Sequence, residues 1–245
     1  MNLITRKTHL APFLVGLALA LPVVGVLQAD PPDHNWNSPQ RLRESVEARF
    51  ADLQTFAADF RITTVEGNRS SSMSGTLYYQ KPGRLRYEFS QPAGNLIVSD
   101  GEIMWYYIRR ANIVGQQSLT LNTENESQRP IFSEDPGPGV SRLFDKYHYR
   151  FLGTAQPRAE FGGRYFVLDL DQRERTGGYQ KIVLYVDAET YMIHRAEADD
   201  GYGKKTSVVF SNIRVNPQLE GRLFQYSPPD NVRVVPNPFV REDAE

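Results

Sequence analysis

The chain of 245 residues contains no cysteine, which excludes disulfide bonds, a thiolate nucleophile and a cysteine-ligated metal site. An exported protein of this size without disulfides must be held together by its hydrophobic core. Bacterial lipoproteins are acylated on a cysteine next to their cleavage site, and that residue is missing too. We therefore expect the processed chain to be free in solution rather than tethered by a lipid.

Motifs of common enzymes are also missing. The sequence has no His-Glu-x-x-His zinc motif, no Gly-x-Ser-x-Gly elbow, no phosphate loop and no dinucleotide fingerprint. His148 and His194 fall in strand-like segments, where a structural role is expected. Asp169, Asp171 and Asp187 form the best acidic cluster and could bind a cation or act on a glycoside, but they lack calcium-loop spacing. The sequence thus predicts no catalytic residue, no metal ligand and no cofactor.

A strong charge of one sign is absent. Arg6 and Lys7 are the only charged residues before Asp30, so the remaining chain carries 26 basic and 29 acidic residues, a net charge of −3. This balance argues against a nucleic-acid binder and against tight docking on anionic lipid. A few basic residues lie close together in the sequence. They belong either to solvated strand edges or to a docking surface. These residues are Lys81, Arg84, Arg86, Arg109-Arg110 and Lys204-Lys205.

The first residues have the order of a secretory signal. Arg6 and Lys7 precede an apolar run from Leu10 to Leu27, and small and polar residues follow. We expect residues 1–29 to be a signal peptide that is cleaved after Ala29, which would place the protein in the periplasm. The alternative is an uncleaved anchor helix, because the apolar run approaches the length that spans a bilayer.

Residues 30–37 contain two prolines and no periodicity, which is typical of a linker. A helix is predicted to begin after Ser38, a good N-cap, with Pro39 in the first helical position. Its apolar stripe consists of Leu42, Val46, Phe50 and Leu53. No second composition class follows, and we expect one domain over residues 38–245.

After the helix the hydrophobic period changes from about 3.6 to 2, which predicts strands. Asp100-Gly101 and Gly177-Gly178 mark turns between them. A polar, Pro- and Gly-rich loop over residues 122–139 leads into a short amphipathic helix. The predicted antiparallel strands begin at Phe56 and continue over residues 73–80, 85–89, 95–99, 102–108, 164–171, 181–187, 191–198 and 205–215.

Several strands are apolar on both faces, above all residues 103–108 and 181–187. A sheet with one wet face would alternate apolar and polar residues. Both faces therefore need cover, although only about two helices are predicted. A strongly curved sheet that encloses an apolar interior under the helices would resolve this. Periodicity leaves open whether that interior is filled with side chains or contains a cavity.

The order and spacing of several segments resemble the LolA family of periplasmic lipoprotein carriers, over nearly the whole chain after the signal. The similarity rests on Leu53-Gln54-Thr55-Phe56-Ala57-Ala58-Asp59-Phe60, Ser74-Gly75-Thr76-Leu77, Lys81-Pro82, Ser90-Gln91-Pro92, Ile97-Val98-Ser99-Asp100-Gly101, Trp105-Tyr106-Tyr107 and Phe224-Gln225-Tyr226-Ser227-Pro228-Pro229-Asp230-Asn231-Val232.

This resemblance implies a mainly β fold, an unclosed antiparallel half-barrel whose apolar concave face is covered by a lid of helices. It implies acylated lipoproteins as cargo, an inner-membrane ABC transporter as donor and an outer-membrane protein as acceptor, with no catalysis; we expect a monomer. Lys81 takes the position of an arginine that holds the lid shut in other members, but its ammonium lacks the planar fork. The candidate cavity and lid residues are Leu77, Lys81, Leu85, Tyr87, Phe89, Trp105, Val140, Leu143 and Phe144.

Other functions remain open on the same sequence. The cargo could be a glycolipid or another lipid. The half-barrel could instead serve as a non-catalytic sensor or interaction module in the envelope. A hydrolase that uses the aspartates is the remaining alternative. A carrier requires a sizeable apolar cavity, whereas an enzyme requires convergent polar groups in a pocket.

Overall fold

The computed structural model describes residues 37–119, 135–175 and 177–236. The predicted signal peptide, its cleavage site at Ala29, the linker before Asn37, most of the 122–139 loop and the tail after Pro236 lie outside the described residues. The chain divides into two compact units, residues 1–33 and 34–245, and every described residue belongs to the second. All that follows concerns this second unit.

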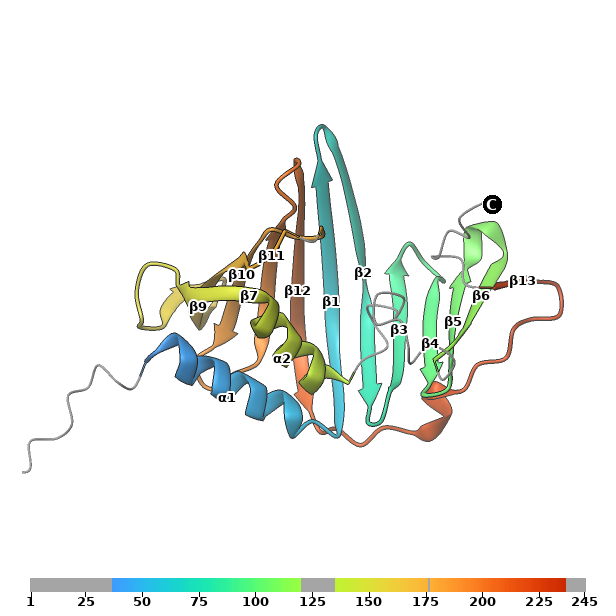
Figure 1. Ribbon diagram of the computed structural model, residues 1–245. Coiled ribbons are helices and arrows are strands. Elements are labelled where there is room, and N and C mark those ends of the chain that lie inside the picture. The colour runs from blue at the N-terminus through green and yellow to red at the C-terminus, as the bar shows by residue number, and fades with distance from the viewer. Residues whose placement is uncertain (1–36, 120–134, 176, 237–245) are drawn as a thin grey trace, which may run out of the picture. The chain divides into compact units, whose positions relative to one another are not determined.

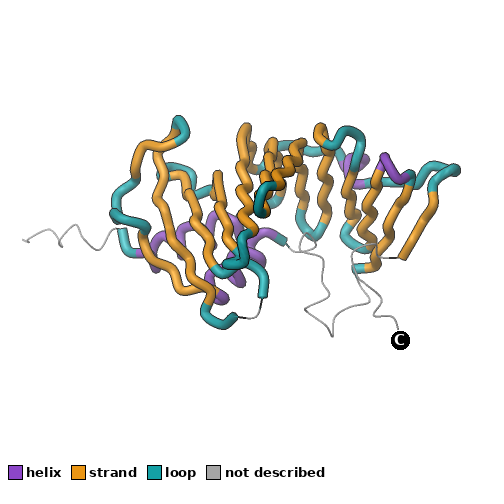
Figure 2. Tube along the Cα trace, turned by 90° about the horizontal axis from the view of Figure 1, so that it is seen from above, coloured by secondary structure: helices purple, strands orange, loops and turns teal. Residues whose placement is uncertain are grey.

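Thirteen strands form a single, strongly curved and unclosed sheet (Figures 1 and 2), which confirms the predicted fold class. The strand order is β13-β6-β5-β4-β3-β2-β1-β12-β11-β10-β9-β7, and β8 also pairs with β9. The strands are β1 (Thr55–Glu66), β2 (Arg69–Gln80), β3 (Arg84–Gln91), β4 (Leu96–Asp100), β5 (Ile103–Ile108), β6 (Ile113–Ser118), β7 (Tyr147–Phe151), β8 (Arg158–Glu160), β9 (Gly163–Gln172), β10 (Lys181–Asp187), β11 (Ile193–Asp199), β12 (Lys204–Val215) and β13 (Arg233–Pro236).

Both predicted helices are present. α1 (Pro39–Ala51) begins where expected, because the Ser38 hydroxyl accepts a hydrogen bond from the Arg41 amide at 3.1 Å. α2 (Pro136–Lys146) is the predicted short amphipathic helix and starts at Pro136. Neither described helix is long and apolar enough to cross a membrane.

The predicted strands are observed with boundaries shifted by a few residues, and almost all pairs are antiparallel. The exception is β13, which pairs with β6 in parallel. β6, β8 and β13 were not predicted, because short strands without clean alternation carry little periodic signal. The centre of the sheet joins distant parts of the chain, since β1 pairs with β12.

Two different covers bury the two faces of the sheet. α1 and α2 lie on one face, over the end of the sheet that contains β7, β9 and β10 (Figure 1). On the opposite face the segment after β12 covers β3–β5: the Arg86 guanidinium donates to the Leu223 carbonyl at 3.0 Å, and Phe224 is buried. Arg86, one of the predicted basic edge residues, thus anchors this cover.

Candidate functional site

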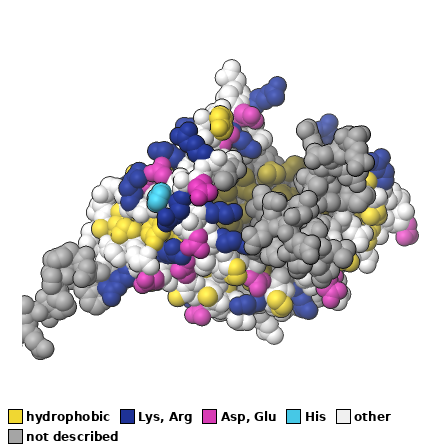
Figure 3. Space-filling view, in the orientation of Figure 1, with side chains coloured by type: hydrophobic (Ala, Val, Ile, Leu, Met, Phe, Trp, Pro, Cys, Tyr) yellow, Lys and Arg dark blue, Asp and Glu magenta, His cyan; other side chains and the backbone are white. Residues whose placement is uncertain are grey.

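An apolar pocket opens on the helix-covered face where the helices end. Its volume is about 220 Å³, and none of the described residues that line it is charged. Figure 3 shows hydrophobic side chains on the floor of a hollow at the centre of this face. The lining residues come from α1, the start of α2 and five strands or their ends, and they are Phe50, Leu53, Phe56, Leu77, Tyr79, Leu85, Tyr87, Pro136, Ile193 and Phe210.

Strand register explains why the two central lining strands share this face. Leu77 pairs with Tyr87, and Tyr79 pairs with Leu85, across β2 and β3. Directly opposed residues of antiparallel strands point to the same side, so these four side chains form one apolar patch. The predicted cavity residues Leu77, Leu85 and Tyr87 are therefore brought together at the pocket.

Aromatic rings extend this patch along the sheet. The ring of Phe60 on β1 lies 5.3 Å, centroid to centroid, from the rings of both Tyr87 and Phe89, in edge-to-face geometry. The predicted residue Phe89 thus lies beside the pocket, packed against one of its lining residues. Burial raises the pKa of the Tyr87 hydroxyl, so this side chain stays neutral around physiological pH.

A carboxylate at the start of α2 holds the helix to the β2–β3 hairpin. One oxygen of Asp135 accepts hydrogen bonds from the Tyr79 hydroxyl at 2.7 Å and from the Gly83 amide at 2.9 Å. Burial and the neighbouring Asp135 carboxylate raise the pKa of Tyr79, which keeps its hydroxyl protonated as a donor. We call Asp135, Tyr79 and Gly83 the Asp135 latch. The latch lies at one wall of the pocket and connects the lid helix α2 to the β2–β3 hairpin.

Lys81, whose part in holding the lid the sequence left open, makes a longer contact than those of this latch. Its ammonium lies 3.5 Å from the carbonyl oxygen of Ala51 at the end of α1, beyond the usual range for a hydrogen bond. Its side chain borders a second cavity of about 390 Å³ between the two helices and the hairpin. The flexible ammonium therefore reaches α1 but forms no short, fixed contact there.

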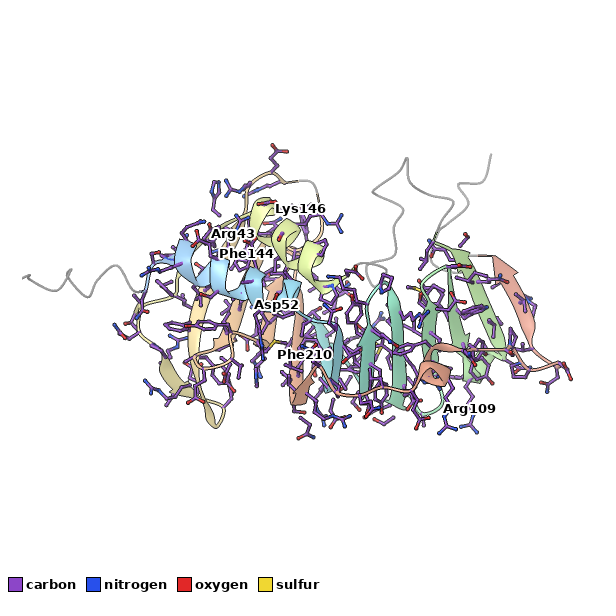
Figure 4. The ribbon with its side chains drawn as sticks, turned by 90° about the horizontal axis from the view of Figure 1, so that it is seen from below. Arg43, Asp52, Arg109, Phe144, Lys146 and Phe210 are labelled. Carbon is purple, nitrogen blue, oxygen red and sulfur yellow. The ribbon has the colours of Figure 1, made fainter. Side chains whose placement is uncertain are left out.

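The predicted lid residues of α2 lie in a packed core instead of the pocket. Val140 and Phe144 are buried between the helices and the sheet, and Leu143 packs against the same cluster. Arg43 of α1 ties the helices together there, with its guanidinium 2.8 Å from Asp145 and 5.7 Å from the centroid of Phe144 (Figure 4). α1 and α2 are thus joined as one body, and the three residues expected in the lid helix hold that helix to the sheet.

Trp105 faces away from the pocket. It pairs with Val98, which pairs with Arg86, so it shares the face covered by the segment after β12. Its ring lies 6.1 Å from that of Tyr226 in this segment. The inward residues of β5 are Met104 and Tyr106. Both faces of this strand are apolar because one faces the concave side and the other faces the C-terminal cover.

The acidic cluster is engaged in ion pairs and a turn. Arg150 of β7 binds both Asp169 and Asp171, the latter at 2.8 Å, and Lys181 lies 3.4 Å from Asp171. Asp187 accepts the Thr190 amide at 2.8 Å and orders the turn after β10. Within the described ranges, no group of three or more histidine, aspartate or glutamate residues is placed to hold a metal ion.

Several pocket residues were not singled out in the sequence, namely Phe50, Pro136, Ile193, Phe210 and the latch residue Asp135. The sequence showed the apolar stripe that contains Phe50, but not which part of the fold this stripe packs against. Phe210 comes from a strand far along the chain and lies on the sheet near the end of α1, which Asp52 marks in Figure 4. Phe210 reaches the pocket because it pairs with Phe60.

Comparisons with known proteins agree with this geometry. The model of the family "Outer membrane lipoprotein carrier protein LolA" matches residues 51–227. The outer-membrane lipoprotein carrier protein of Legionella pneumophila (strain Lens) is 28% identical over 198 residues, which cover 80% of this chain and 90% of that protein. The corresponding protein of Methylococcus capsulatus is 26% identical over 205 residues, covering 81% and 91%.

Among solved structures, an uncharacterized conserved protein from Thermus thermophilus has a TM-score of 0.53 at 14% identity, covering 81% of this chain and 98% of its own. At this identity the likeness shows the fold alone. The family model, by contrast, spans well over half of the sequence. With its curved sheet and lid helices, the chain belongs to the LolA family of outer membrane lipoprotein carrier proteins.

Proposed function

We propose that this protein is a periplasmic carrier that shields the acyl chains of lipoproteins in the apolar pocket and ferries them from the inner to the outer membrane. Residues 38–245 form the carrier domain, and residues 1–29 are a signal peptide removed near Ala29. The observation that carries the proposal is a pocket at the ends of the two helices, with no charge among its described lining residues, in a member of this family. The work is binding and release, so the protein is not an enzyme.

The physical basis is hydrocarbon burial. Each methylene group removed from water contributes about 0.8 kcal/mol. Among the pocket's described lining residues, the only polar side-chain groups are the hydroxyls of Tyr79 and Tyr87. Binding through burial alone lets the cargo pass to an acceptor with a larger apolar surface without ATP at that step. An inner-membrane ABC transporter as donor and an outer-membrane protein as acceptor fit this task.

The pocket must widen to accept cargo. Its volume of about 220 Å³ lies below the roughly 300–1,000 Å³ of typical ligand pockets. Tyr79 and Pro136 both line the pocket, and Asp135, next to Pro136, is held by the Tyr79 hydroxyl. Separation of the Asp135 latch would move the joined helices away from the hairpin and enlarge the pocket.

A second cargo class is compatible with the same pocket. No side chain in the described part of the lining would bind a charged headgroup, so these residues select acyl chains rather than a particular lipid. A glycolipid or another acylated lipid would bury its chains there equally well. The test must therefore identify the cargo as well as show binding.

The test is native mass spectrometry of the mature protein purified from a periplasmic extract, followed by lipid extraction and by titration with a fluorescent fatty-acid probe. A co-purifying triacylated protein or peptide supports lipoprotein carriage. A co-purifying free glycolipid or phospholipid would support carriage of the second cargo class instead. An empty protein that also fails to bind the probe would reject carriage and favour an interaction module of the envelope.

A further inference from the structure

One half of β2 has an open edge. β1 pairs with β2 along its whole length, from Glu66–Arg69 to Thr55–Gln80. On the other side, β3 pairs only with Ser74–Gln80. No described strand pairs with Arg69–Met73 on that side, and Figure 1 shows β2 extending beyond the end of β3. The sheet therefore contains a notch whose wall is a row of backbone amides and carbonyls.

The local sequence ends β3 at this level. A bulge separates Ser74 from Gly75 in the β2–β3 pairing, and Pro92, next after β3, has no amide hydrogen to continue the ladder. Gly75 allows the close approach, because a Cβ atom there would lie 1.9 Å from the Glu88 carbonyl oxygen. The open edge is thus built into these residues.

Hairpin geometry fixes which backbone groups face the notch. Gly67 and Asn68 form a two-residue loop, so Glu66 and Arg69 are a hydrogen-bonded pair. Hydrogen-bonded and non-hydrogen-bonded pairs alternate along antiparallel strands. The amides and carbonyls of Ser70 and Ser72 therefore point away from β1. Alternating donors and acceptors at this spacing are complementary to an extended peptide backbone.

This edge carries less protection than the edge strand β7. Proteins usually block pairing at edges with charges, prolines or bulges. β7 carries the exposed residues His148 and Arg150 within the strand, whereas the open stretch of β2 has a charge only at its first residue, the exposed Arg69. The notch segment Ser70–Ser72 consists of three serines without charge, and both Ser70 and Ser71 are exposed.

The notch is continuous with the apolar face that leads to the pocket. Met73, with 38% of its surface exposed, pairs with Ile62, two residues from Phe60, and shares the pocket face with Leu77. Five residues separate Leu77 from Ser72, which corresponds to about 17 Å along a strand. A chain that leaves the pocket can reach the notch with a handful of extended residues.

We propose that the polypeptide immediately following the acylated residue of the cargo adds to β2 as an extra strand along Ser70–Met73. This inference rests on the proposed carriage of lipoproteins and adds a second point of contact to it. The pocket binds acyl chains whatever molecule they are attached to. The notch, in contrast, selects cargo in which an extended peptide follows the acylated residue. The notch thereby distinguishes a lipoprotein from a free lipid.

The experiment uses the mature chain and two synthetic probes: a ten-residue peptide whose N-terminal cysteine carries three acyl chains, and the same acylated cysteine as an amide without the peptide. Ser72→Pro removes only an amide that faces the notch, a position where strands tolerate proline. Ser72→Ala, which keeps that amide, is the matched control. We expect Ser72→Pro to weaken lipopeptide binding about tenfold, and to leave binding of the amide unchanged; Ser72→Ala changes neither.

Hydrogen exchange gives an independent readout. The Ser70 and Ser72 amides should become protected when the lipopeptide binds and stay unprotected with the acylated amide. Ser70→Pro serves as the second variant if Ser72→Pro alters the unfolding midpoint. Equal loss of both probes, or no loss, overturns strand addition. Protection that appears with protein concentration alone would show that a second copy occupies the edge, which also overturns it. If neither probe binds the wild type, carriage itself fails.

Discussion

One end of the sheet and its centre solve the same packing problem in different ways. Around β9 and β10, helix side chains fill the space above the strands, and Leu168, Leu170 and Phe144 are fully buried. Around β1–β3 the strands also present apolar side chains to this face, yet a pocket remains above Leu77 and Tyr87. The two interiors that the sequence left open, a filled core and a cavity, thus both occur in one sheet.

The difference lies in the cover, not in the strands. α1 ends at Ala51 and α2 begins at Pro136, so the joined helices lie over the β7–β10 end and stop at the pocket. Phe144 and Val46 project into the filled core, whereas only Phe50, Leu53 and Pro136 border the pocket from the cover side. An apolar strand face therefore indicates burial, but the reach of the opposing elements decides what buries it.

The largest expected effect belongs to the filled core. Leu168→Ala removes a fully buried side chain from β9 where helices and strands enclose it on all sides. We expect a loss of about 4 kcal/mol in the free energy of unfolding, measured by urea denaturation, because neighbouring residues cannot collapse into the space. Acyl-probe affinity of the folded protein should not change. A change in affinity would contradict the separation of the two regions.

The same substitution at the pocket should have a smaller effect on stability and a larger effect on binding. Leu77 keeps 8% of its surface exposed and already borders empty volume. Leu77→Ala should cost about 2 kcal/mol, at the low end for buried leucine. It should weaken acyl-probe binding several-fold, because apolar contact area is lost. A stability loss equal to that of Leu168→Ala would show that the pocket is as tightly packed as the core.

The Asp135 latch should control the rates at which a ligand enters and leaves the pocket. Asp135→Ala removes the acceptor shared by Tyr79 and Gly83, so we expect faster uptake and faster release of an acyl probe in stopped-flow fluorescence. The matched control is Lys146→Ala on the same helix, which removes an exposed charge outside the latch and should change the free energy of unfolding by at most about 0.5 kcal/mol. Identical kinetics for the two variants would remove the latch from the opening step.

The smallest expected effect is a pH dependence of the free energy of unfolding that leaves acyl binding unchanged. Burial lowers the pKa of His194 below its ordinary value of 6.5, against a smaller opposing effect of Asp187. The unfolded chain then binds more protons near this pH, so the free energy of unfolding should fall as the pH drops from about 7 towards about 5.5. His194→Gln should flatten this part of the profile. Acyl binding should stay constant, since no pocket residue is an acid or a histidine.

Local elements were predictable because short-range chemistry fixes them. Ser38 and Pro39 defined the start of α1, and short apolar runs next to the turn signals Asp100-Gly101 and Gly177-Gly178 defined β5 and β10. The structure places the candidate residues differently: Leu77, Leu85 and Tyr87 line the pocket, Val140 and Phe144 lie in the core under the lid helix, and Trp105 lies on the opposite face. The latter three are large apolar residues in the expected elements, and periodicity cannot tell which of two covered faces, or which end of a helix, borders a cavity.

The sequence by itself determined that this chain forms a curved, mainly antiparallel sheet with two helices and apolar residues on both faces, because capping, turn chemistry and alternation act over a few residues. The tertiary structure decided the parallel pairing of β13 with β6, the C-terminal cover over Trp105 and the place where the helices stop. These features depend on contacts between residues that can be more than a hundred positions apart in the sequence. Examples are Arg86 with Leu223 and Phe60 with Phe210. No local pattern encodes such contacts.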